Sequence, residues 1–168
     1  ALLGVSIECA QCLHPPTDVW SQTDYYGMQA FFTEVKFKGT PRGDALHIDG
    51  APPTKHPRTG EVVVAHALGT EMPEALPIES GGDRRQVLAD WLLAKDNPRF
   101  SRNIANRIWA HFLGRGIIAP ADDIRESNPP SNPELLEALA SHLVEKDYDL
   151  HAMIRTITAS RTYQLSSE

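Results

Sequence analysis

The chain has 168 residues, of which 41% are hydrophobic and 23% are charged, a composition typical of a globular protein with a substantial core. Its formal net charge of -6 at pH 7 argues against a nucleic-acid-binding protein, because phosphate recognition requires a basic excess. No stretch approaches the ~20 apolar residues of a membrane-spanning helix. The sequence begins at Ala1 and runs almost directly into a cysteine motif, so we expect a processed chain or a piece of a longer one.

Residues 1–37 form the first of three segments, and they contain both cysteines. The middle of this segment is irregular, because two consecutive prolines interrupt it. After them, Asp24 is expected to cap a short helix that continues through Phe32. The alternating residues 33–37 predict a strand.

Residues 38–82 form a loop-rich second segment with seven of the eleven glycines and six of the thirteen prolines. The best predicted strand in it is the apolar run 62–65. We expect residues 46–48 to pair with this run, since residues 50–60 supply turn-forming residues between the two. Residues 70–82 have the composition of an extended linker.

Residues 83–168 predict a four-helix region, with helices at about 84–95, 98–113, 132–146 and 150–161. Asp83 with Gln86 and Ser131 with Glu134 have the spacing of capping boxes. Asn97 precedes a proline at a helix start, and the glycines at 114 and 116 are expected to end the same helix. The fold class is therefore mainly α, with an irregular first segment and a small β-containing middle.

The helix at 98–113 is expected to lie at the centre of the core. Its apolar residues recur every fourth position, at Phe100, Ile104, Ile108 and Phe112, with Ala105 and Trp109 beside them. In the last helix, Leu150, Met153, Ile154 and Ile157 have the spacing to pack against it.

A basic stretch that spans residues 84–115 precedes an acidic stretch that spans residues 122–149, and we expect these two stretches to face each other in part.

The cysteines stand in the spacing Cys9-Ala10-Gln11-Cys12, followed by Leu13 and then His14. In a C-x-x-C-H haem site the thiols bind the haem vinyl groups and the adjacent histidine ligates iron. Leu13 occupies that histidine position here. His14 is the nearest candidate ligand, but a shift of one residue would rotate its side chain by ~100° on a helix.

Three interpretations of this motif remain open. Cys9 and Cys12 can carry haem c, with His14 as a displaced iron ligand. They can instead join His14 and one of the histidines at 47, 56 or 66 in a zinc site, since zinc usually takes four such ligands. The third interpretation is a short disulfide or a vestigial pair of thiols that supports the bend of the segment.

The helical region offers a second candidate site. Asn103, Asn106, Arg107 and His111 follow one another at helical spacing, on the side opposite Phe100, and together they can bind a carboxylate or sulfated ligand. The structural alternative is that Arg107 and the two amides tie neighbouring loops and helix ends together.

The sequence also resembles a known family pair. The first segment is similar to the planctomycete cytochrome-like family of large secreted proteins, and the helical region to the domain of unknown function that follows it. The resemblance rests on residues 2–12 and 18–27 for the first family, and on residues 83–85, 88–92, 106–116, 127–131, 155–157 and 160–166 for the second.

The resemblance implies an extracytoplasmic, haem-c-associated redox or electron-transfer module that spans the junction of two domains of a longer protein. By this analogy Cys9 and Cys12 attach the haem, and His14 is the candidate iron ligand. The implied partners are the other domains of that protein and a redox partner. The alternative is a non-catalytic structural or ligand-binding module linked to surface polysaccharide handling, in which the cysteines form a disulfide or remain vestigial.

Overall fold

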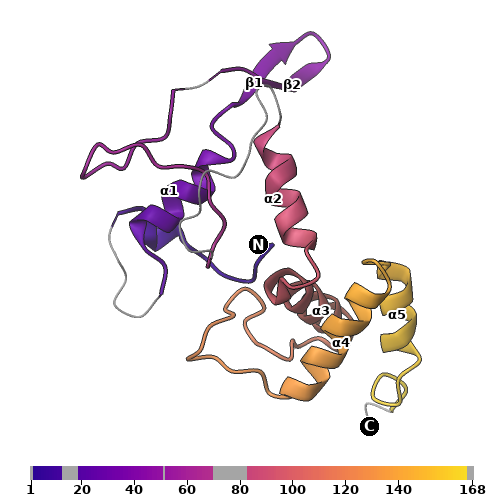
Figure 1. The fold of residues 1–168 in the computed structure, drawn as a ribbon. Helices are drawn as coiled ribbons and strands as arrows, with labels where there is room; N and C mark the ends of the chain where they lie inside the picture. Colours follow the sequence, from indigo (N-terminus) through magenta and orange to yellow (C-terminus); the bar gives the residue numbers. More distant parts are fainter. Residues whose placement is uncertain (1, 13–18, 51, 70–82, 166–168) are drawn as a thin grey trace. The chain divides into compact units, whose positions relative to one another are not determined.

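The computed structural model describes residues 2–12, 19–50, 52–69 and 83–165. In this part of the chain the architecture is mainly helical, with five α-helices, one short 3-10 helix and a two-stranded sheet, as the sequence predicts (Figure 1). The chain divides into two compact units. We name Ile7–Trp91 the cysteine unit, and Ala1–Ser6 together with Leu92–Glu168 the helical unit.

The cysteine unit begins with the 3-10 helix η1 (Glu8–Gln11) and the helix α1 (Gln22–Ala30), which contact each other. The helix begins and ends about two residues earlier than the sequence predicts, and its cap is Ser21 rather than Asp24. Asp24 stands three residues into the helix and completes a capping box, because its carboxylate accepts a hydrogen bond from the Ser21 N–H at 2.7 Å while the Ser21 hydroxyl accepts one from the Asp24 N–H.

The strands β1 (Val35–Thr40) and β2 (Gly43–Ile48) form an antiparallel hairpin, in which Thr40 lies opposite Gly43. The sequence-based pairing of residues 46–48 with 62–65 is therefore wrong. Residues 62–65 form no strand, and Val62 makes only an isolated bridge with Lys55. A two-residue connection closes a hairpin at a much lower entropic cost than a loop from 49 to 61 does, and Gly43, with φ +111°, permits the tight turn.

The remaining helices are α2 (Arg84–Leu93), α3 (Pro98–Leu113), α4 (Pro133–Glu145) and α5 (Leu150–Thr158), within about three residues of the predicted bounds. The caps of α3 are confirmed: the Asn97 side chain accepts a hydrogen bond from the Arg99 N–H, and Gly114 adopts a left-handed conformation. The predicted linker at 70–82 lies outside the described residues.

Neither predicted capping box in the helical region forms. At α2, the Asp83 carboxylate accepts a hydrogen bond from the Arg85 N–H, and Gln86 donates to Asp90 instead of reaching back. At α4, the cap is Asn132, whose side chain accepts a hydrogen bond from the Leu135 N–H at 3.0 Å. Tertiary contacts compete for the serine, because Ser131 donates its hydroxyl to the Ile117 carbonyl at 2.8 Å.

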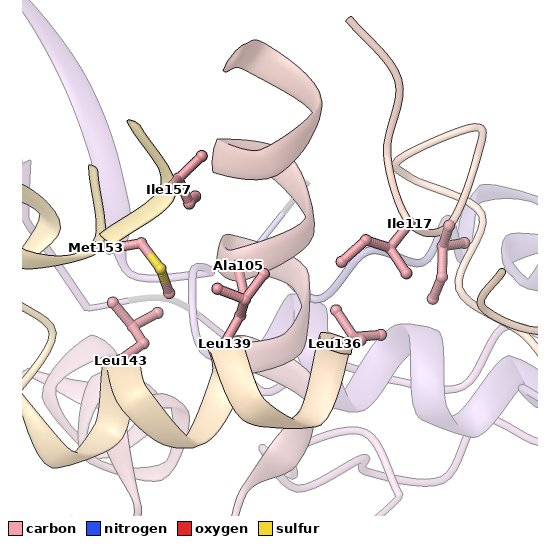
Figure 2. Packing of buried hydrophobic residues seen from close by; sticks show 8 residues of the cluster. Ala105, Ile117, Leu136, Leu139, Leu143, Met153 and Ile157 are labelled. Carbon is pink, nitrogen blue, oxygen red and sulfur yellow. The ribbon is translucent and has the colours of Figure 1, made fainter. Parts of the chain in front are cut away.

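The core of the helical unit lies among α3, α4 and α5, which contact one another pairwise. Figure 2 shows how its buried apolar side chains converge on Ala105 of α3. The predicted burial of α3 is confirmed in part, because Ala105 is fully buried while Ile104, Ile108, Trp109 and Phe112 are half-buried against the cluster. In α5 Met153 and Ile157 are buried, whereas Leu150 is exposed. The cluster consists of Ala105, Ile117, Ile118, Leu136, Leu139, Leu143, Met153 and Ile157.

Candidate functional site

The cysteine motif lies on a single turn of η1. Cys9 is within this 3-10 helix, and Cys12 ends it by donating its backbone N–H to the Cys9 carbonyl. Both side chains are exposed, and both thiols are free. The turn therefore presents two thiols to solvent from neighbouring positions.

Two contacts hold this turn in place. Ala10, between the two cysteines, is buried, and its N–H donates to the Ile7 carbonyl at 3.1 Å. The Gln11 carbonyl accepts a hydrogen bond at 2.8 Å from the side chain of Gln22, a buried residue in the first turn of α1. The two residues between the cysteines thus anchor the turn, and the thiols on either side of them are exposed.

The two exposed thiols have the spacing that covalent attachment of haem c requires, whereas Leu13 and the candidate iron ligand His14 lie outside the described residues. Among the described histidines of the cysteine unit, His56 accepts hydrogen bonds at Nδ1 from the N–H groups of Arg58 and Thr59, both at 3.3 Å. His66 is also engaged, as described next, and His47 is on the exposed strand β2. The described residues therefore bear only on the two positions at which thioether bonds would form.

A buried histidine, His66, packs against α1 in a contact that the sequence analysis did not predict. His66 is 2% exposed, its Nδ1 lies 3.0 Å from the Val64 carbonyl oxygen, and its Nε2 lies 3.6 Å from the Asp24 carboxylate. The imidazole lies directly against Gly27, where a Cβ would come within 2.1 Å of the ring. A glycine inside a predicted helix was the signal, since such a glycine often marks a close packing contact.

The proposed ligand-binding stripe on α3 does not form one exposed surface. Asn103 and Asn106 are fully buried, whereas Arg107 is half-buried and His111 is exposed. Asn106 binds the backbone of Ile118 twice: its amide donates to the Ile118 carbonyl at 3.0 Å, and its oxygen accepts from the Ile118 N–H at 2.9 Å. This contact ties the loop after α3 to the helix, as the structural alternative expected.

Two arginines of α3 form ion pairs with acidic residues farther along the chain. Arg107 pairs with Asp122, and Arg102 pairs with Glu137 at 2.6 Å. His111 instead meets the ring of Phe112 edge-on, with 5.1 Å between the ring centroids. The expectation that the basic and acidic stretches face each other in part is confirmed by these two pairs.

The described part of the chain lacks two other kinds of site. It contains no group of three or more His, Cys, Asp and Glu side chains placed to hold a metal ion. None of the helices there has the length and apolar character to cross a bilayer. The zinc prediction includes His14, so it stays a prediction.

Comparison with known proteins identifies two families along the chain. Residues 1–37 match PSCyt2, described as a protein of unknown function (DUF1549), and residues 84–168 match PSD1, described as a protein of unknown function (DUF1553). No curated protein and no solved structure matches the chain. Two adjacent matches of this kind indicate a multidomain protein. The second match covers half of the sequence, and the chain therefore belongs to the DUF1553 family of proteins of unknown function.

Proposed function

We propose that this chain is a redox module that carries haem c on Cys9 and Cys12. The observation that supports the proposal is the exposure of both thiols on one anchored turn. Each thiol would add its S–H across one vinyl C=C, with the sulfur bonding one carbon and the proton reaching the other. When bound, haem would supply one-electron transfer at its iron.

The chain's own residues would hold the group in two ways. Cys9 and Cys12 would form the thioether bonds, while Ala10 and the bond between Gln22 and Gln11 keep the turn from rearranging. His14 is the proposed iron ligand, displaced by one residue because Leu13 occupies the usual position. The family resemblance adds an extracytoplasmic location and a redox partner to this proposal.

The proposal is tested by the visible absorption spectrum of the chain, produced in cells that contain haem-attachment machinery. A Soret band and a pyridine haemochrome of the thioether-linked type are expected. The bands should vanish in Cys9→Ser/Cys12→Ser, whereas His14→Ala should retain attached haem with a changed spectrum. A colourless protein under these conditions would refute the proposal.

A second candidate is a non-catalytic structural or ligand-binding module, in which Cys9 and Cys12 form a disulfide. The observation that favours it is the internal use of Asn106, which ties a loop rather than facing solvent. A link to surface polysaccharide handling follows from the resemblance. Here the protein would be colourless and would lose two mass units on oxidation, and metal analysis of the same sample would detect the lesser alternative, zinc.

A further inference from the structure

The first described residues of the chain belong to the helical unit, although a different family model matches them. Residues 1–37 match DUF1549 and residues 84–168 match DUF1553, yet Ala1–Ser6 forms one compact unit with Leu92–Glu168. We call residues 2–6 the strap. The boundary between the two compact units therefore falls inside the first family match.

The strap makes specific contacts at Leu3 and Gly4. Leu3 is only 7% exposed. The Gly4 carbonyl accepts a hydrogen bond from the Ile124 N–H at 2.8 Å, on the loop between α3 and α4. An apolar anchor and a backbone hydrogen bond at consecutive positions are contacts by which a short peptide segment can be recognised.

Gly4 is required at its position for two independent reasons. Its φ of +68° is left-handed, a conformation that side chains other than glycine's rarely adopt. A Cβ there would also lie 2.3 Å from Ile124 Cδ1 and 2.8 Å from Asn103 Oδ1. The backbone of the strap therefore approaches the helical unit more closely than any side chain would permit.

The strap packs against Asn103 and Ile124, which we call its seat, and both residues adjoin the core. Asn103 is a fully buried residue of α3, and Ile124 packs against the buried cluster formed with α4 and α5. Displacing the strap would expose Leu3 and the Ile124 N–H, and would uncover the buried face of Asn103. Loss of the strap should therefore weaken the helical unit as a whole.

We infer that the helical unit contains a binding seat for a short, turn-forming Leu-Gly segment, and that the strap from the DUF1549-matched region is its occupant. The two matched families are thus joined by non-covalent recognition as well as by the chain between them. The strap is thus an intramolecular ligand of residues 92–168, the other part of the helical unit. We therefore expect the same segment, supplied as a separate peptide, to bind the helical unit when the native strap is displaced.

The test compares two alanine variants of the full chain, Gly4→Ala and Gly114→Ala. Both glycines are left-handed, at +68° and +76°, but a Cβ at Gly114 meets nothing within 4 Å. Backbone strain is thus matched, and the difference reports the seat. Gly4→Ala should accelerate hydrogen exchange at the Ile124 amide by about tenfold or more and lower the melting temperature further than Gly114→Ala.

A peptide with the sequence of residues 1–7 then tests recognition directly. Added in excess to the Gly4→Ala chain, it should raise the melting temperature and restore protection at Ile124, while the same peptide with alanine at position 4 should do neither. Leu3→Ala is the milder variant for the same rescue if Gly4→Ala fails to fold. Equal effects of the two glycine variants, or no rescue by the peptide, would overturn the inference.

Discussion

The two amides that stand out in the sequence of the helical unit, Asn103 and Asn106, are buried, whereas the two thiols of the cysteine unit are exposed to solvent. In the helical unit, Asn106 is fully buried and binds the backbone of Ile118. In the cysteine unit, Cys9 and Cys12 are exposed on a turn that other residues anchor. Asn106 of the helical unit therefore serves the fold, and the chemistry that we propose for the chain lies in the cysteine unit.

The largest expected effect is at Asn106. Asn106→Ala removes both partners of the Ile118 peptide groups and leaves a cavity, so the free energy of unfolding should fall by about 3 kcal/mol or more. Asn132→Ala is the control, because it removes an exposed helix cap worth about 1 kcal/mol. Urea unfolding of both variants measures the difference. Equal losses of unfolding free energy would mean that the hydrogen bonds between Asn106 and Ile118 contribute no more to stability than an exposed helix cap does.

In the cysteine unit the largest expected effect is at Gly27. Glycine to alanine inside a helix normally stabilises it by about 1 kcal/mol, but here the added Cβ would collide with the His66 ring. We expect Gly27→Ala to destabilise the fold by about 2 kcal/mol instead. Gly50→Ala, where a Cβ meets nothing within 4 Å, is the control.

A double-mutant cycle sharpens this prediction. In a His66→Ala background the obstructing ring is absent, so the cost of Gly27→Ala should shrink markedly. Thermal unfolding of the four proteins provides the coupling free energy. Additive effects would contradict the packing of His66 against Gly27.

A smaller effect is expected at Asp149, the cap of α5, through pH. The N–H of Ala152, and then that of His151, donates to this carboxylate and holds its pKa below the ordinary value of 3.8, although a slight desolvation of the exposed carboxylate opposes the shift. The stabilisation is therefore present above pH 4 and is lost as the pH falls through the folded-state pKa. Asp149→Asn keeps a capping oxygen without the charge, so its unfolding midpoint in urea should change less between pH 5 and pH 3 than that of the wild type. The same slope in both proteins would exclude this role.

The smallest expected effect is at Phe37 on the hairpin. This side chain is 75% exposed, so Phe37→Ser should change the free energy of unfolding by less than about 0.5 kcal/mol. Leu143→Ala, at a fully buried position in α4, should cost about 3 kcal/mol in the same assay. A large loss from Phe37→Ser would show that the hairpin packs against something in solution.

Local signals made most of the helices predictable. Asn97 and Gly114 define the ends of α3 through contacts within a few residues, so its bounds follow from the sequence. The strand pairing failed because residues 62–65 have β propensity, whereas pairing is decided by loop length and the turn at Gly43. The cap of α4 was misplaced by one residue because Ser131 binds the Ile117 carbonyl, a partner distant in sequence.

The same distinction applies to the candidate site. The spacing of Cys9 and Cys12 is visible in the sequence, but their exposure depends on the burial of Ala10 and the bond from Gln22. The contact of Asn106 with Ile118 spans a helix and a loop, so helical periodicity alone assigned Asn106 to an open face. Non-local contacts of this kind separate a ligand-binding residue from a structural one, and spacing does not encode them.

The central claim is that the chemistry of this chain resides in Cys9 and Cys12. Its most direct test is the denatured mass of the full chain purified from cells with haem-attachment machinery, compared with that of Cys9→Ser/Cys12→Ser. The account predicts a wild-type polypeptide heavier by one covalently bound haem, and a double variant at its bare mass. A wild-type chain at its bare mass would contradict the claim.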